Sequence, residues 1–181
     1  MEAIQCIKER RSVRTFKTEK VSQEIVEKII ETARFAPSWK NTQTARYIVI
    51  ENKEMKELLA EKAVLGFSHN AGIMKNAPQL VIITCVHGRS GFERDGSYST
   101  SKEDRWEVFD AGIATQTFCL AAYANGVASV IMGVFDEDKV KEIVGISEGQ
   151  VVCAILAVGY AEGETAAPKR KEVSELVTYF I

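Results

Sequence analysis

The sequence has few cysteines and histidines, no long apolar run and no surplus of positive charge. Its four cysteines lie far apart without a C-x-x-C pair, and its two histidines lack metal-ligand spacing, so we expect neither a disulfide scaffold nor a metal site. The longest apolar run, residues 151–160, is half the length needed to cross a bilayer. Residues 1–11 carry charges where a signal peptide would be apolar. These absences favour a cytoplasmic protein with free structural thiols.

The charge balance excludes one class of partner. With 23 Lys plus Arg against 25 Asp plus Glu, the formal net charge is −2, and the sequence pI is about 5.8. A nucleic-acid module needs a basic surplus, and no basic stripe with interleaved aromatic residues is present. We therefore expect neither a nucleic-acid nor a membrane partner.

The common nucleotide-binding and nucleophile motifs are also missing. There is no G-x-G-x-x-G after a strand, no G-x-x-x-x-G-K-[ST] and no G-x-S-x-G elbow. No cysteine lies in a nucleophile context, and we assign no catalytic side chain. An enzyme without conventional acid–base groups relies on a bound cofactor for its chemistry.

The order of the expected elements predicts an α+β fold in a single domain, residues 1–181. No repeat or Pro/Gly/Ser-rich linker divides the chain. Capping residues and apolar spacing predict helices over residues 2–9, 22–35, 54–63, 104–124 and 137–144. Strands are predicted over residues 47–51, 80–86, 128–132 and 151–160. A central sheet of four or five strands covered by helices follows from this order.

Periodicity also predicts which helix faces are buried. The inward residues should be Ala3, Ile4 and Ile7 in the first helix, Ile25, Ile29, Ile30 and Ala33 in the second, and Met55, Leu58 and Leu59 in the third. The long helix 104–124 is apolar nearly all round, so it should lie in a core or an interface. Residues 172–181 are amphipathic and are predicted to form a helix or an added strand. The polar loop 87–102 is long enough to be a lid, a binding segment or simply mobile.

Two basic clusters stand near the ends of the chain. Residues 1–20 hold six basic side chains against three acidic ones. Within them, the N-terminal basic cluster consists of Arg10, Arg11, Ser12 and Arg14, and the C-terminal basic cluster consists of Lys169, Arg170 and Lys171. Guanidinium groups and a hydroxyl can hold a phosphate through forked hydrogen bonds. Alternatively, the cations complement a helix C-terminus or form a solvated surface run.

Two further segments have the composition of a ligand site. Residues 36–43 follow a helix and concentrate amide and hydroxyl groups that can read a heteroaromatic edge, although an ordinary polar turn has the same composition. The strand 129–132 ends at Gly133, where the absence of a side chain lets a backbone N–H approach a flat ligand. An ordinary strand-terminal turn is the alternative.

Taken in order, these segments resemble the nitroreductase family of flavin mononucleotide (FMN) enzymes over nearly the whole chain. The resemblance depends on the N-terminal basic cluster, on Pro37, Ser38, Asn41 and Gln43, and on Asp110, Gly112 and Gln116 of the long helix. It continues with Met132-Gly133, the strand end at residues 158–160, and the C-terminal basic cluster. Thr44-Ala45 departs from the Pro-Trp that follows this Gln in many members.

The resemblance implies an intertwined homodimer with two FMN sites at its interface. It implies that Arg10, Arg11, Ser12, Lys169 and Lys171 contact the FMN phosphate and ribityl chain, and that Arg14 lies near the pyrimidine edge. The stretch with Pro37, Ser38, Trp39 and Asn41 would come from the other subunit. Asn70 would contact the flavin, and the backbone of Met132 and Gly133 would face flavin N5.

The implied activity is hydride transfer from NADH or NADPH to FMN, followed by reduction of a nitroaromatic, quinone or similar acceptor in a ping-pong cycle. Two alternatives are a flavin enzyme of the same fold with a different reaction, such as reductive dehalogenation or flavin fragmentation, and a non-catalytic FMN carrier or sensor. The sequence decides neither the nucleotide nor the acceptor. It also leaves open whether Trp39 or Phe67 gates the pocket and whether Arg170 contacts the phosphate.

Overall fold

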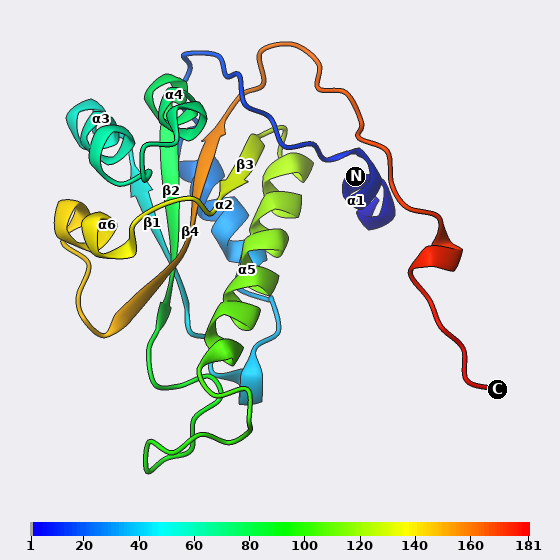
Figure 1. Cartoon of the computed structure of the whole chain (residues 1–181). Coiled ribbons are helices and arrows are strands. Elements are labelled where there is room, and N and C mark those ends of the chain that lie inside the picture. Colours follow the sequence, from blue (N-terminus) through cyan, green and yellow to red (C-terminus); the bar gives the residue numbers. More distant parts are fainter. Residues whose placement is uncertain (1) are drawn as a thin grey trace.

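The structure is a computed structural model that describes residues 2–181 (Figure 1). Four strands form one sheet: β1 (Ala45–Ile50), β2 (Gln79–Val86), β3 (Ala128–Met132) and β4 (Gln150–Gly159). The α-helices are α1 (Ala3–Glu9), α2 (Gln23–Ala33), α3 (Lys53–Lys62), α4 (Ser68–Asn76), α5 (Arg105–Ala124) and α6 (Glu137–Val144). Two single 3₁₀ turns, η1 (Trp39–Asn41) and η2 (Val173–Glu175), complete the described elements. The predicted α+β class and the four-stranded sheet are confirmed.

The sheet has the order β1-β2-β4-β3, with every neighbouring pair antiparallel. Its central strand β2 is buried along nearly its whole length. Leu80 and Ile82 point to one face, and Val81 and Ile83 to the other, as the period of two requires. Both faces of the sheet are therefore covered, as the continuous apolar run of residues 80–86 indicated.

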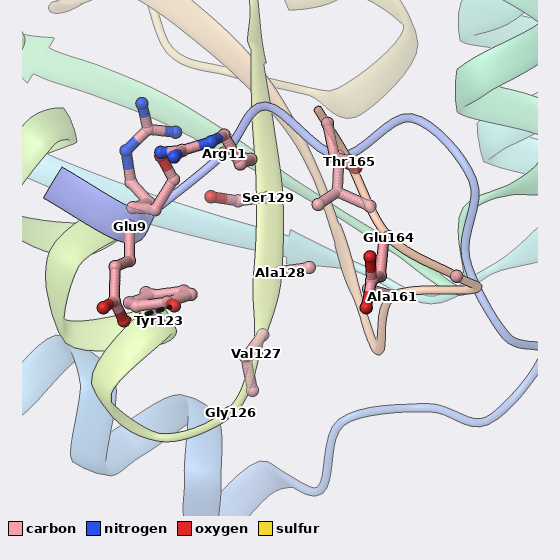
Figure 2. Close-up of a pocket in the computed structure, with 13 residues that line it drawn as sticks. Glu9, Arg11, Tyr123, Gly126, Val127, Ala128, Ser129, Ala161, Glu164 and Thr165 are labelled. Atoms are coloured by element: carbon pink, nitrogen blue, oxygen red, sulfur yellow. Dashed lines mark hydrogen bonds between the residues drawn. The ribbon is translucent and has the colours of Figure 1, made fainter. Parts of the chain in front are cut away.

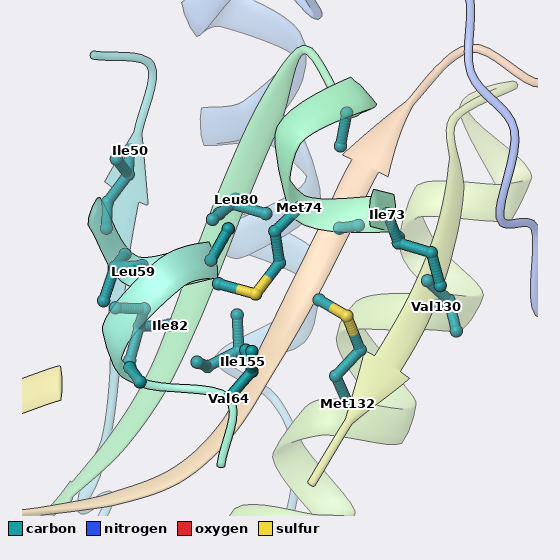
Figure 3. Close-up of a cluster of buried hydrophobic side chains, with 14 of the residues drawn as sticks. Ile50, Leu59, Val64, Ile73, Met74, Leu80, Ile82, Val130, Met132 and Ile155 are labelled. Atoms are coloured by element: carbon teal, nitrogen blue, oxygen red, sulfur yellow. The ribbon is translucent and has the colours of Figure 1, made fainter. Parts of the chain in front are cut away.

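The helices form a layer on each side of the sheet. Helices α3, α4 and α6 cover one face, where Leu59, Met74 and Val140 pack with Leu80 and other strand residues (Figure 3). Helices α2 and α5 cover the other face, where Ile29 and Phe118 are fully buried. Burial of side chains of this size stabilises a fold by about 1.5–3 kcal/mol each, so these two clusters fix the sheet on which the site is built.

Capping residues set the helix ends where the sequence placed them. The Ser22 Oγ accepts the backbone N–H of Ile25 at 3.4 Å, and an Asp136 carboxylate oxygen accepts that of Lys139 at 3.1 Å. Gly145 closes α6 in the left-handed conformation, with φ of 76°. The bounds of β3 and α6 match those expected from sequence to the residue.

Three predicted buried faces are wrong in part. In α1, Cys6 is buried against α5, whereas Ala3, Ile4 and Ile7 are exposed. Leu58 of α3 is 37% exposed, although its neighbour Leu59 is fully buried. In α2, Val26 is buried, while Ile25 and Ile30 pack only at the rim of the core. The apolar spacing correctly predicted these helices, but which face of each helix packs against the rest of the fold depends on tertiary packing.

The chain beyond β4 does not form the predicted helix or strand. Residues 162–181 are all exposed and contain only the single turn η2, and they run away from the sheet past α1 (Figure 1). Exposed apolar side chains nevertheless lie along this tail: Val173, Leu176, Val177, Tyr179, Phe180 and Ile181. A single chain offers them no surface to pack on. Among residues 2–181, no helix is both long and apolar enough to span a membrane.

Candidate functional site

The N-terminal basic cluster is held against the edge of the sheet. Helix α1 ends at Arg10, whose backbone N–H donates to the Cys6 carbonyl at 3.0 Å. The chain then runs extended, because Ser12 pairs with Ser129 of β3 as a parallel bridge and Val13 donates to the Ser129 carbonyl at 3.1 Å. This pairing places the cluster beside β3, the strand that leads to Met132 and Gly133.

The three arginines of this cluster have different surroundings. Arg11 donates from Nη1 to the carbonyls of Lys8 and Arg10, at 2.7 and 2.9 Å, and so neutralises the end of α1. Arg14 donates to the Ser12 carbonyl at 3.0 Å. In contrast, Arg10 Nε is buried and has no hydrogen-bond partner within residues 2–181. A buried donor without an acceptor lowers the stability of the fold. Arg10 is therefore the cation of the cluster that would gain most from a bound anion.

The C-terminal segment folds back onto this cluster. A cavity of about 260 Å³ is lined from the N-terminal side by Arg10, Arg11, Ser12 and Arg14 and from the C-terminal side by Thr165, Ala166, Pro168 and Arg170. Of the three residues of the C-terminal basic cluster, Arg170 lines the cavity, while Lys169 and Lys171 lie outside its lining and are exposed. Residues more than 150 positions apart in sequence thus share one positively charged hollow.

A neighbouring cavity of about 370 Å³ shares Arg10, Arg11 and Thr165 with the first (Figure 2). Tyr123 at the end of α5 and Ser129 of β3 lie along it. The Tyr123 hydroxyl donates to the Glu9 carboxylate at 3.4 Å. Burial is the larger cause that raises the pKa of this phenol, and the nearby Glu9 charge raises it further. Together the two cavities form a groove, the basic groove, beside α1 and the start of β3.

Asn70, Met132 and Gly133 lie on the part of the fold that α4 covers. Asn70 is buried in α4, and Met132 packs with Ile73 and Val130 in the same apolar cluster (Figure 3). Because the Met132 side chain points into the core, only its backbone is left to meet a ligand. A Cβ built on Gly133 would meet nothing within 4 Å, so the surface beside the strand end is open.

Residues 37–43 form a second group of candidate residues, held in a strained loop. Lys40, Asn41 and Gln43 have φ of 44°, 55° and 50°, a conformation that costs non-glycine residues about 1–3 kcal/mol each. The Ser38 Oγ accepts the Gln43 N–H at 2.9 Å and closes the loop. Pro37, Asn41 and Gln43 line one cavity of about 260 Å³, and Ser38 lines an adjoining one of about 160 Å³. Strain of this kind persists at binding sites.

Two carboxylates of α5 anchor this region, a role that sequence reasoning missed. Asp110 is buried and accepts the Trp39 backbone N–H at 2.8 Å and the Ser90 hydroxyl at 2.5 Å. Glu107 is also buried and accepts the Gly88 N–H at 2.7 Å, with His87 Nδ1 at 3.1 Å. They are the only acidic residues of a helix that is otherwise largely apolar. Their isolation in the sequence is the signal that could have identified them as anchoring residues. They tie residues 87–90 and 39 to one helix end.

The two groups of candidate residues stand at opposite ends of α5. Asp110 contacts the strained loop and Tyr123 contacts the basic groove, and the thirteen residue steps from one to the other span about 20 Å at about 1.5 Å per step. Figure 1 shows η1 near one end of α5 and α1 near the other. Within one chain, the structure therefore does not bring Pro37, Ser38, Trp39 and Asn41 to Arg10 and Ser12.

The sequence was then compared with known proteins. Residues 7–160 match the profile of the Nitroreductase family. The chain belongs to this family. A relative from Archaeoglobus fulgidus, provisionally named NADH dehydrogenase/NAD(P)H nitroreductase, is 30% identical over 167 residues, covering 90% of this chain and 87% of the relative.

Two further proteins are similar to this chain over most of its length. An iodotyrosine deiodinase of Hydra vulgaris is 28% identical over 196 residues, covering 94% of this chain and 70% of the relative. The solved structure of an FMN-dependent nitroreductase from Clostridium difficile has a TM-score of 0.77 and 25% identity, covering 98% of each chain. The fold is therefore that of nitroreductases.

Proposed function

We propose that this nitroreductase-family chain is an FMN-dependent oxidoreductase. It takes hydride from NADH or NADPH and reduces nitroaromatic, quinone or similar acceptors in a ping-pong cycle. The observation that carries the proposal is the shared cavity of the two basic clusters, which come from opposite ends of the sequence. When bound, FMN supplies the hydride-accepting chemistry. The protein binds and orients, so no side chain is needed as nucleophile or general acid.

The basic groove suits the phosphate and ribityl chain of FMN. A phosphate would give the buried Arg10 Nε its missing acceptor, and the adjacent Ser12 hydroxyl can donate to the same group. Arg11 contributes charge while its Nη1 is held by the chain's own carbonyls. Lys169 and Lys171 remain FMN-binding candidates. Arg170, which lines the cavity, joins them.

The flavin ring would lie toward the end of β3. The open surface beside Gly133 leaves room for a flat ring against the backbone of residues 132–133. Asn70 of α4 would contact the ring from the same side. The Arg14 guanidinium is exposed and can approach the pyrimidine edge, where a fixed cation stabilises the negative charge gained on reduction.

A homodimer would complete the site. Pro37, Ser38, Trp39 and Asn41 lie about 20 Å from the basic groove of their own chain, so a second copy must supply them if they contact the same flavin. Exposed apolar side chains on α1, α5 and the tail would be covered in such a dimer, among them Ile4, Phe109 and Leu176. We place this dimer in the cytoplasm, where its four cysteines stay free.

The absorbance spectrum of the purified protein tests the proposal. It should show the bands of bound flavin, and anaerobic NADH or NADPH should bleach them. An electron acceptor added after the oxidised nucleotide has dissociated should then restore the spectrum, as a ping-pong cycle without a ternary complex requires. A colourless protein that cannot be reconstituted with FMN would falsify the proposal. A yellow protein that neither nucleotide bleaches would instead indicate a carrier or sensor.

A further inference from the structure

A cavity of about 360 Å³ lies beside the strained loop, at the end of α5 away from the basic groove. It is lined by Lys40 and Thr42 on one side and by residues of the polar loop on the other: Arg89, Phe92, Glu93 and Arg94. Its lining therefore brings three cations and one anion together. The proposed FMN phosphate site does not include any of these residues.

Among residues 2–181, two of the three cations in this cavity have no hydrogen-bond or ion-pair partner. Lys40 Nζ pairs with the Glu93 carboxylate at 3.0 Å. Hydrogen bonds from the Ser99 hydroxyl and from Lys40 lower the pKa of Glu93, so this carboxylate is ionised at neutral pH and committed to Lys40. Within residues 2–181, neither guanidinium, of Arg89 or of Arg94, donates a hydrogen bond or pairs with a carboxylate. The formal excess of two positive charges thus faces the cavity.

The loop that carries these arginines is firmly anchored. Ser90 is buried and donates to Asp110, and Gly88 donates to Glu107. Gly91 has φ of 85°, and a Cβ there would lie 2.5 Å from the Glu103 carbonyl oxygen and 3.0 Å from the Trp106 ring, so the loop turns tightly against the start of α5. Arg89 and Arg94 are consequently presented by a fixed backbone.

The opposite wall also has an unused donor. The Thr42 Oγ1 is buried and lacks a hydrogen-bond partner among residues 2–181. It belongs to the strained loop, in which the residues on either side, Asn41 and Gln43, have left-handed φ. The two guanidiniums without a partner around one hollow form a donor set that a phosphate can satisfy.

We propose that Arg89 and Arg94, beside the Lys40–Glu93 ion pair, bind a phosphate of the reduced nicotinamide dinucleotide. This inference rests on the proposed function, because Lys40 lies between Ser38 and Asn41, the residues proposed to reach the flavin. A donor whose nicotinamide stacks on the flavin must place its adenosine and phosphates outside the ring pocket, and the cavity beside the strained loop would receive one of these phosphates. The bound phosphate is either the pyrophosphate, common to both nucleotides, or the 2′-phosphate of NADPH.

The test is anaerobic stopped-flow reduction of the FMN-loaded protein by three donors. These are NADPH, NADH and an N-benzyl dihydronicotinamide, which carries no phosphate. The double variant Arg89→Gln/Arg94→Gln keeps a polar, hydrogen-bonding side chain at each position but removes both charges. Its second-order rate with NADPH should fall at least tenfold, because charge-assisted contacts are lost. Its rate with the phosphate-free donor should stay within twofold of the parent.

A matched variant controls for general charge effects. Lys28→Gln/Lys62→Gln removes the same charge from exposed sites on α2 and α3 and should leave all three rates unchanged. A larger fall with NADPH than with NADH identifies the 2′-phosphate, and equal falls identify the pyrophosphate. Unchanged rates with both nucleotides overturn the inference, as does an equal loss with all three donors.

A binding measurement separates this inference from the proposed function. ADP-ribose and adenosine 2′,5′-bisphosphate are titrated into the FMN-loaded protein, with tryptophan fluorescence as the readout. Trp39 is a local reporter, because the Lys40 ammonium lies 5.5 Å from its ring centroid. Loss of binding in the arginine double variant supports the site even if no donor bleaches the flavin. Equal binding by parent and double variant overturns it.

Discussion

The two ends of α5 are organised in opposite ways. At the first end, buried Asp110 and Glu107 accept hydrogen bonds from the strained loop and from the loop after β2, so the chain fixes the backbone of both loops itself, while Trp39 Nε1 and Thr42 Oγ1 have no partner among residues 2–181. At the second end, the basic groove presents an unpartnered Arg10 donor and is closed by an exposed tail. The first end is preorganised by its own side chains. The second has donors that only a ligand or another chain can satisfy.

This contrast separates residues that build the site from residues that bind. A group whose hydrogen bonds are complete within the chain contributes to stability, and its loss should change folding first. A buried donor without an acceptor costs stability as long as its site is empty, so its loss should change ligand affinity first.

The largest effect is expected from deletion of residues 172–181. The tail bears six exposed apolar side chains, and burying each in a dimer contributes about 1.5–3 kcal/mol. Sedimentation velocity should show that the truncated chain is monomeric at micromolar concentration, with much weaker FMN binding. Circular dichroism should retain the helix signal, because no residue of 162–181 is buried in the single chain. A truncated chain that remains dimeric would contradict the role given to the tail.

Asp110→Ala should be the most destabilising point substitution at the preorganised end. It removes the acceptor of two hydrogen bonds to a buried carboxylate, each worth about 1.5–3 kcal/mol. Urea denaturation should show a loss of roughly 3 kcal/mol or more in the free energy of unfolding. Glu31→Ala, an exposed acid on α2, serves as the control. A loss no greater than that of the control would mean that Asp110 does not anchor the loop.

Arg10→Gln should weaken FMN binding more than Arg11→Gln does. Loss of a charge-assisted contact worth about 1.5–3 kcal/mol corresponds to roughly ten- to a hundredfold in Kd for Arg10. Arg11 should show only a few-fold change, because its Nη1 already bonds to two chain carbonyls. Fluorescence titration of the apoprotein with FMN measures both values. Equal losses would remove the distinction between a binding and a capping arginine.

The same titration sharpens the assignment at the C-terminal basic cluster. Since Arg170 lines the cavity and Lys169 does not, Arg170→Gln should weaken FMN binding about tenfold, the loss of one charge-assisted contact. Lys169→Gln should have the smaller effect. The opposite ranking would favour the residues that the family resemblance implies over the one that lines the cavity.

The smallest effect is expected in the sheet between the two ends. A hydrogen bond with Cys153 and burial both raise the pKa of Cys85, whose Sγ lies 3.5 Å from that of Cys153, and burial raises the pKa of Cys119. Both thiols should therefore resist iodoacetamide in the native protein at pH 8, as mass spectrometry can show. All four cysteines should react after denaturation. Rapid native labelling of Cys85 would indicate that β2 opens readily.

The sequence predicted best where local rules decide the structure. Ser22, Asp136 and Gly145 cap helices through contacts within a few residues, so those ends were read directly. The four strands were also recognised, because each is an apolar run bounded by polar residues. The family resemblance supplied the fold, since the order of weak motifs along the chain is more specific than any one of them.

The sequence predicted less where distant segments meet. The face of α1 was inverted, because Cys6 rather than Ile4 and Ile7 meets α5. The bond between Asp110 and residue 39 joins positions 71 residues apart, and no local pattern encodes it. The cavity under Arg89 and Arg94 likewise depends on the loop after β2 folding onto the strained loop.

Helix α5 also sets which mutations this fold tolerates. The helix advances about 1.5 Å and turns about 100° with each residue, so inserting one residue between Asp110 and Tyr123 would swing one end out of register with the other. Substitutions in this interval change packing alone, whereas a single insertion or deletion would misalign the loop anchor and the groove wall together. The interval from residue 110 to residue 123 therefore acts as a fixed spacer. Related sequences should accept substitutions there but not insertions or deletions.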